Sequence, residues 1–109
     1  MALTRKKLAF LQLAATKGDI YDPAASTTGL IHNITLHNTN TSSEDIELFY
    51  NDGTNEYQLF DFSMDAQETI VFDFRGEGFV IESTTGAKLT GNTTTAAKVT
   101  ISVDGTEET

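Results

Sequence analysis

The sequence predicts an all-β protein, an antiparallel β-sandwich or jelly roll with an N-terminal arm, and three observations lead to this fold class. Beyond residue 18, apolar residues recur with a period of two, which is the spacing of a strand that buries one face. Turn residues interrupt these runs at intervals of roughly 8–12 residues. Threonine is abundant, and β-branched side chains favour half-exposed sheet faces. We therefore expect about seven strands and no helix.

The first two expected strands lie on either side of a proline. Residues 18–22 form a short run that Pro23 ends, because proline cannot donate a hydrogen bond to a neighbouring strand. Residues 30–37 alternate between apolar and polar positions. If this alternation is regular, the even positions face the core and the odd positions face outward. The even positions are Leu30, His32, Ile34 and Leu36, and the odd positions are Ile31, Asn33, Thr35 and His37.

A hairpin is expected next. Residues 45–50 and 57–62 both alternate, and the polar segment 51–55 separates them. The pair Asp52-Gly53 in this segment supplies residues that tolerate a positive φ, as tight hairpin turns require.

The second half of the sequence predicts three further strands. Residues 69–74 and 79–83 lie on either side of a glycine-marked turn, and the threonine- and glycine-rich residues 84–95 are expected to be a connection. The last strand, residues 98–104, has the clearest alternation. Its expected inward side chains are Val99, Ile101 and Val103, and those of residues 69–74 are Ile70, Phe72 and Phe74.

Charge is distributed unevenly along the chain. Residues 1–18 contain Arg5, Lys6, Lys7 and Lys17 and no acid, whereas the other 91 residues hold three bases and sixteen acids. A cationic arm on an acidic body is a pattern that needs an explanation. The predicted organisation is an extended arm at 1–17, a β-sandwich domain at 18–105 and a polar C-terminal tail at 106–109.

The arm also carries large apolar side chains, each of which would cost roughly 1.5–3 kcal/mol to leave in water. A frayed terminus would expose them. A secretory signal peptide would need a longer apolar run than residues 8–15, which Gln12 interrupts. We therefore expect the arm to dock on a neighbouring subunit. The residues expected to make this contact are Arg5, Lys6, Lys7, Leu8, Phe10 and Leu11.

Composition argues against several function classes. The absence of cysteine excludes disulfide scaffolds, thiolate zinc sites, iron–sulfur sites and cysteine nucleophiles. A net charge of −9 argues against nucleic acid or an anionic membrane as a partner. No apolar run approaches the roughly 20 residues of a membrane-spanning helix.

The few candidate chemical groups are better explained by structure. His32 and His37 lie five residues apart on one expected strand, so they would point to opposite faces and could not share a metal ion. Residues 51–56 are rich in oxygen ligands, but they lack the spacing of an EF-hand calcium loop, and a hairpin turn explains them. We therefore predict no catalytic residue, no metal site and no cofactor.

The order of the motifs resembles that of small virion proteins of tailed bacteriophages, and the resemblance covers nearly the whole chain. The short arm Leu3-Thr4-Arg5-Lys6-Lys7 is followed by Ile20-Tyr21-Asp22-Pro23, then by an isoleucine-rich strand that ends in Asn38-Thr39, and later by Asp65-Ala66-Gln67-Glu68-Thr69-Ile70. These motifs are loose, because most of them are strand and turn patterns. The sequence departs from the usual pattern at Ala24, where a glycine often follows the proline.

This resemblance implies a non-enzymatic β-sandwich, often trimeric, made in the host cytoplasm and assembled on the virion. The expected role is that of a capsid decoration (cement) protein, in which the arm residues contact the major capsid protein or other virion subunits. Two alternatives remain open. One is a tail or baseplate protein or a host-glycan-binding adhesin that uses loops 38–43 and 51–55. The other is a secreted carbohydrate-binding module in which Tyr50 and Tyr57 contact sugar.

Overall fold

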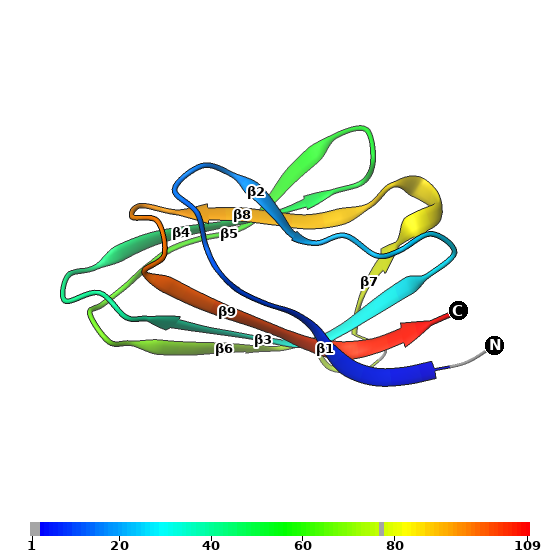
Figure 1. Cartoon of the computed structure of the whole chain (residues 1–109), viewed down its shortest axis with the longest axis horizontal. Helices are drawn as coiled ribbons and strands as arrows, with labels where there is room; N and C mark the ends of the chain where they lie inside the picture. The colour runs from blue at the N-terminus through cyan, green and yellow to red at the C-terminus, as the bar shows by residue number, and fades with distance from the viewer. Residues whose placement is uncertain (1–2, 77) are drawn as a thin grey trace.

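The computed structural model describes residues 3–76 and 78–109, which form two antiparallel sheets packed face to face (Figure 1). Sheet A consists, in spatial order, of β1 (Leu3–Gln12), β9 (Val99–Glu108), β3 (Thr28–Asn38) and β6 (Thr69–Asp73), and β7 (Phe79–Glu82) pairs with β3 beyond the end of β6. Sheet B consists of β2 (Gly18–Tyr21), β8 (Lys88–Thr93), β4 (Glu44–Asn51) and β5 (Glu56–Met64). A short 3₁₀ turn, η1 (Ser83–Thr85), joins β7 to β8. The predicted all-β antiparallel sandwich is confirmed.

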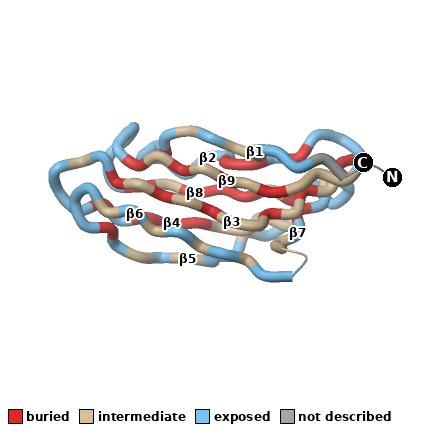
Figure 2. Tube along the Cα trace, turned by 90° about the horizontal axis from the view of Figure 1, so that it is seen from below, coloured by how far each residue is buried: buried red, intermediate tan, exposed pale blue. Residues whose placement is uncertain are grey.

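The core lies between the two sheets, and its residues alternate with less buried ones along most of β3, β4 and β9 (Figure 2). The alternation predicted for the last strand is confirmed, since Val99, Ile101 and Val103 are fully buried. The predicted hairpin is also confirmed, because β4 and β5 pair across the turn that contains Gly53. Other core side chains are Ile34 and Leu36 from sheet A and Ile46, Leu48, Met64 and Leu89 from sheet B.

Strand β8 lies inside the segment predicted to be a connection, 84–95, and that prediction is wrong. The strand has little apolar content because two of its buried positions are threonines that form hydrogen bonds and a third is a glycine at a close approach to β4. Thr90 and Thr93 are buried and donate hydrogen bonds of 2.7 and 3.0 Å to glutamate side chains. Gly91 lies so close to β4 that an added Cβ would come within 2.7 Å of the Glu47 carbonyl oxygen. A central strand of this composition has no apolar alternation to reveal it.

A bulge in β3 shifts the phase of its alternation. Ile31 pairs with Gly105 and Asn33 pairs with Asp104, so His32 is an extra residue on the β3 side of the ladder. An extra residue of this kind moves every side chain on one side of it to the opposite face.

The prediction that Leu30 and His32 face the core is therefore wrong. Ile31 is fully buried, as are Ile34 and Leu36 on the other side of the bulge. Leu30 and His32 are only half-buried, and both lie on the outer face of sheet A.

The segment 1–17 is not detached from the sandwich, so the predicted boundary between arm and domain is wrong for the residues that the structure describes. Strand β1 pairs with β9 from Leu3 to Gln12, and Leu13 is buried in the core. The reason is that alternate side chains of the segment complete the apolar layer of sheet A. The predicted polar tail 106–109 is corrected in the same way, because β9 continues to Glu108 and pairs with both β1 and β3.

Candidate functional site

Strand β1 is an edge of sheet A, and it carries the exposed residues that we call the basic edge: Arg5, Lys6, Lys7 and Phe10. The register with β9 sets which way they point. Lys7 is opposite Asp104 and Phe10 is opposite Ser102, so both lie on the outer face of the sheet. Phe10 is 67% exposed, which is the highest value among the large apolar side chains of the described residues.

The lysines of the basic edge form ion pairs with β9. Lys6 Nζ lies 3.0 Å from Glu107 Oε1, and Lys7 Nζ lies 2.9 Å from Asp104 Oδ1. Lys7 Nζ also lies 5.5 Å from the centre of the Phe10 ring. About half of each lysine side chain is exposed, and exposed ion pairs of this kind contribute only about 0–1 kcal/mol. A partner with its own carboxylates could therefore compete for these lysines.

The six predicted contact residues all lie on β1, but the structure gives them different surroundings. Arg5, Lys6, Lys7 and Phe10 are exposed. Leu8 and Leu11 are half-buried and pack against the core, so they attach the strand to the sandwich. Phe10 and Leu11 differ in exposure because successive side chains of a strand alternate between its two faces.

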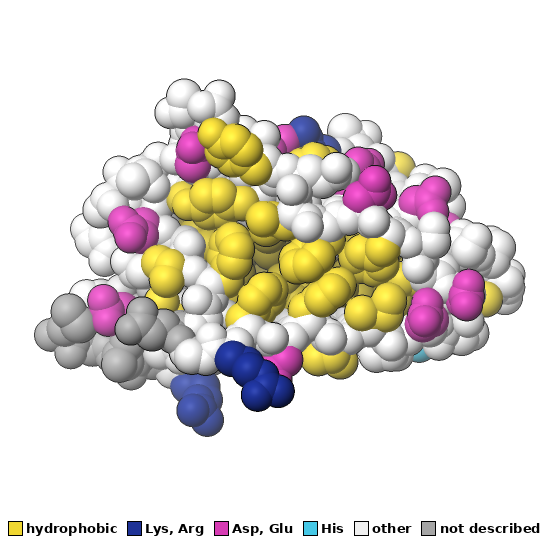
Figure 3. Space-filling model, turned by 180° about the vertical axis from the view of Figure 1, so that it is seen from behind, with side chains coloured by type: hydrophobic (Ala, Val, Ile, Leu, Met, Phe, Trp, Pro, Cys, Tyr) yellow, Lys and Arg dark blue, Asp and Glu magenta, His cyan; other side chains and the backbone are white. Residues whose placement is uncertain are grey.

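A second candidate surface, which we call the aromatic side, lies where the two sheets open between β5 and β6 (Figure 3). A groove of about 470 Å³ runs between these strands. Phe60 stacks on Phe72 with ring centres 4.4 Å apart, and Phe62 meets Phe72 edge to face at 5.5 Å. The residues that line the groove are Leu59, Phe60, Asp61, Phe62, Ser63, Ile70 and Phe72.

The aromatic side is open because of the topology. On the opposite side of the sandwich, residues 13–17 cross from β1 in sheet A to β2 in sheet B and cover the core (Figure 1). On this side β5 and β6 are both edge strands, and only the short turn 65–68 joins them. Within residues 3–76 and 78–109, no further strand lies over the groove.

Acidic residues accompany the aromatic side. Residues 56–76, which contain both edge strands and their turn, hold five acids and one base, and one of the acids, Glu56, is paired with Lys17 on the outer face of sheet B. Asp61 lines the groove itself. In Figure 3, Asp and Glu side chains lie around much of the margin of the apolar patch, with Lys or Arg at its lower margin. The basic edge, whose two lysines are paired with Glu107 and Asp104, and the more acidic aromatic side lie on opposite edges of sheet A.

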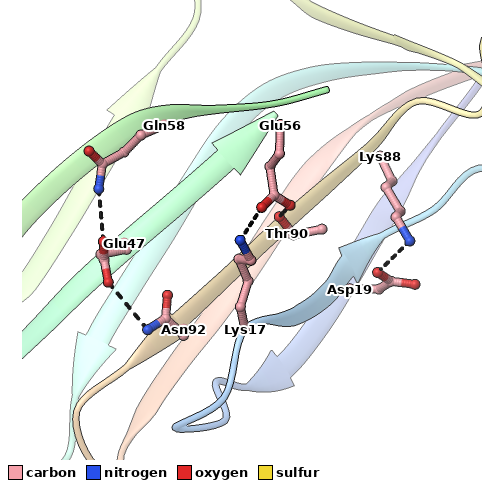
Figure 4. A network of polar contacts seen from close by, with 8 residues as sticks. All are labelled: Lys17, Asp19, Glu47, Glu56, Gln58, Lys88, Thr90 and Asn92. Atoms are coloured by element: carbon pink, nitrogen blue, oxygen red, sulfur yellow. Dashed lines mark hydrogen bonds and ion pairs between the residues drawn. The ribbon is translucent and has the colours of Figure 1, made fainter. Parts of the chain in front are cut away.

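The outer face of sheet B carries a polar network that is internally paired (Figure 4). Lys17 forms an ion pair with Glu56 and lies 4.5 Å from the centre of the Phe49 ring. Hydrogen bonds from Lys17 and Thr90 lower the pKa of Glu56, and they do so more than its burial raises it. Lys88 pairs in the same way with Asp19 at 2.9 Å.

A second chain of bonds completes this network. Gln58 and Asn92 each donate a hydrogen bond to Glu47, over 2.9 and 3.4 Å. These bonds therefore link β2, β8, β4 and β5 of sheet B to one another.

The two histidines lie on the same face, so the prediction of opposite faces is wrong. The bulge at His32 turns it to the outer face of sheet A, where its Nε2 lies 3.1 Å from Thr106 Oγ1. His37 Nδ1 lies 2.7 Å from Thr69 Oγ1 on that face. Among the described residues, no three His, Asp or Glu side chains are grouped so that they could hold a metal ion.

The oxygen-rich loop at 51–55 is a closed hairpin turn. The Asp52 carboxylate accepts hydrogen bonds from the backbone N–H groups of Thr54 and Asn55, at 2.9 and 2.7 Å. Both bonds lower the pKa of Asp52, and the bond from Asn55 has the larger effect. The Asn51 side chain accepts a third bond from the N–H of Gly53.

The aromatic side is the surface that the sequence did not reveal. Alternation predicted that Ile70, Phe72 and Phe74 share the inward face, and all three do pack against the core. That they are only half-buried follows from β5 and β6 being edge strands, which depends on the arrangement of the whole chain. The available signal was the excess of phenylalanine in two neighbouring strands.

No protein-family model matches this sequence, and the search of curated proteins found no significant relative. In the part of the chain that the structure describes, no helix has the length and apolar character needed to cross a membrane. The candidate site consists of two surfaces, the basic edge and the aromatic side.

Proposed function

We propose that this chain is a non-enzymatic structural protein of a bacteriophage virion, a capsid decoration protein that binds the capsid lattice as a homo-oligomer and stabilises it. Its partners are the major capsid protein or other virion subunits. The order of its motifs resembles that of small virion proteins of tailed bacteriophages, and this resemblance supports a place in a bacteriophage virion.

One structural observation supports an assembly role. The sandwich carries two unlike contact surfaces on opposite edges, a basic one with an exposed phenylalanine and an acidic one with an aromatic groove. A domain of 109 residues buries a modest core, so it gains much from burying further apolar surface against neighbours. Two such surfaces suit a protein that contacts neighbouring virion subunits, including other copies of itself.

The proposed mechanism is binding alone. A decoration protein that contacts neighbouring capsid subunits stabilises their junction, because its binding free energy is lost when the subunits separate. The packaged DNA pushes the shell outward, and the bound protein opposes that expansion. The acidic body of the protein faces solvent in this arrangement and limits non-specific adhesion to anionic surfaces.

The test uses phage particles produced without this protein, to which the purified full chain is then added. Sedimentation measures binding to filled heads, and a dye that fluoresces on DNA measures the temperature at which the particles release their genome. We expect saturable binding to heads and a higher release temperature. Particles of an unrelated phage, which naturally has no such protein, serve as the control and should not bind the added chain.

Two outcomes would overturn the proposal. Binding to tails alone would favour a tail or baseplate protein. Binding to host cells or soluble glycans, with none to particles, would favour an adhesin or a carbohydrate-binding module.

A further inference from the structure

We propose that the aromatic side of one copy binds the basic edge of a second copy, so that copies of this chain associate head to tail. The proposal rests on the proposed function in one respect, because it identifies the neighbouring virion subunit on the basic edge as another copy of this chain. It is argued from three features of the described residues.

The first feature is an apolar anchor with a matching groove. Phe10 projects from the outer face of β1 with 67% of its surface exposed. The groove between β5 and β6 is open, has a volume of about 470 Å³ and is lined by Phe60, Phe62 and Phe72. Edge-to-face and offset contacts between aromatic rings contribute about 0.5–1.5 kcal/mol beyond the burial of their area. An exposed aromatic ring that enters a pocket of aromatic rings is typical of the centre of a stable interface.

The second feature is charge. Residues 57–76 hold four acids and one base, whereas the basic edge carries Arg5, Lys6 and Lys7, of which the two lysines are paired with Glu107 and Asp104 of β9. Two aromatic sides placed against each other would bring like charges together, which opposes a symmetric contact between identical surfaces. A basic edge placed against an aromatic side brings opposite charges together. The charge distribution therefore selects the second arrangement.

The third feature is the position of the two surfaces at opposite edges of sheet A. Strand β1 forms one edge and β6 the other. Each edge strand presents unpaired backbone donors and acceptors along its free side, which favour the addition of another strand. A contact between unlike edges repeats from copy to copy, and it closes into a ring when the rotation between copies permits.

The experiment measures the mass of the full chain in solution by light scattering, for the wild type and two charge-introducing variants. Phe10→Glu damages the basic edge and leaves the groove intact. Leu59→Glu damages the groove, where Leu59 is 36% exposed, and leaves the basic edge intact. We expect the mass of the wild type to be a multiple of the monomer mass of 11.9 kDa, at least twice that value, and we expect each variant to have the monomer mass.

Mixing the two variants tests the head-to-tail arrangement itself. A mixture holds one intact edge and one intact groove on different molecules, so we expect it to form a dimer of twice the monomer mass and nothing larger. Thr35→Glu, which introduces the same charge at the middle of the outer face of sheet A, is the matched control and should keep the wild-type mass. Circular dichroism and the midpoint of urea unfolding establish that each variant is folded.

Three results would overturn the proposal: a monomeric wild type, a Phe10→Glu variant that keeps the wild-type mass, or a mixture of folded variants that stays monomeric. These results are distinct from failure of the proposed function, which would appear as absence of the protein from phage heads whatever its mass in solution.

Discussion

Tyr21 Oη donates a 2.7 Å hydrogen bond to Glu107 Oε2, and this bond joins β2 of sheet B to β9 of sheet A. Burial, the hydrogen bond and the charge of Glu107 together raise the pKa of the tyrosine well above its usual range. The hydrogen bond from Tyr21, with the nearby Lys6 ammonium, lowers the pKa of Glu107. This contact closes the end of the sandwich where β1 begins and β9 ends.

Removing this hydrogen bond should lower the free energy of unfolding. Tyr21→Phe deletes the donor and leaves a partly buried carboxylate with Lys6 as its remaining partner. We expect a loss of about 1–2 kcal/mol, measured by urea denaturation. Tyr57→Phe, at a side chain that is 52% exposed, is the control and should change the value by less than about 0.5 kcal/mol. Equal effects of the two variants would contradict the assigned role of Tyr21.

The protein should lose stability in acid, with a large contribution from Glu44. This side chain is 2% exposed and accepts hydrogen bonds from the Thr95 N–H at 2.8 Å and from Thr93 Oγ1 at 3.0 Å. Burial alone would raise its pKa, but these bonds and one from Asn40 outweigh burial and lower the pKa. The unfolded state therefore takes up the proton first as the pH falls. The resulting stabilisation is complete above the unfolded pKa of about 4.3 and is lost below it.

The Glu44→Gln variant tests this pH dependence. Its amide would turn a donor toward groups that are themselves donors, so we expect a loss of about 1–3 kcal/mol at neutral pH. The difference from wild type should shrink as the pH is lowered from 5 to 3, because the wild-type carboxylate becomes protonated. A difference that stays constant over this range would show that the carboxylate charge does not contribute.

The bulge at His32 predicts opposite responses at two adjacent positions. Ile31 is fully buried, so Ile31→Ala should lower the free energy of unfolding by about 2–5 kcal/mol. Leu30→Ala should have a much smaller effect, of about 1 kcal/mol or less, because Leu30 lies on the outer face. Chemical denaturation of the two variants side by side measures both values. The reverse order of effects is what regular alternation without a bulge would produce.

Gly53 should be the less replaceable of two glycines with positive φ. It has a φ of +98°, and an added Cβ would collide with the carbonyl oxygen of Thr85. Gly53→Ala should therefore cost about 1–3 kcal/mol. Gly76 has a φ of +73°, and among the described residues no atom lies within 4 Å of where its Cβ would be. Gly76→Ala should cost about 1 kcal/mol, and an equal cost at both positions would exclude the collision at Gly53.

The elements that were predictable from the sequence are those whose signals are local. The alternation of Val99, Ile101 and Val103 and the turn at Gly53 depend on a few neighbouring residues, and both are present in the structure. Strand β8 was missed because hydrogen bonds and a close approach to β4 replace apolar burial along it. The bulge was missed because one extra residue, His32, has no distinctive sequence signature.

The candidate site divides in the same way. The basic edge was predictable, since residues 1–18 hold four bases, three of them on this edge, and no acid. Its incorporation into sheet A was not predictable, because it depends on pairing with β9 about a hundred residues away. The exposure of Phe60 and Phe72 likewise depends on β5 and β6 both being edge strands.

The proposed decoration role is tested by counting the copies of this protein in each phage particle. Purified particles would be analysed by quantitative peptide mass spectrometry, with the major capsid protein as the internal reference, after separation of heads from tails. A decoration role predicts many copies, in a fixed ratio to the major capsid protein, in the head fraction. Absence from the heads, or a few copies confined to the tails, would contradict it.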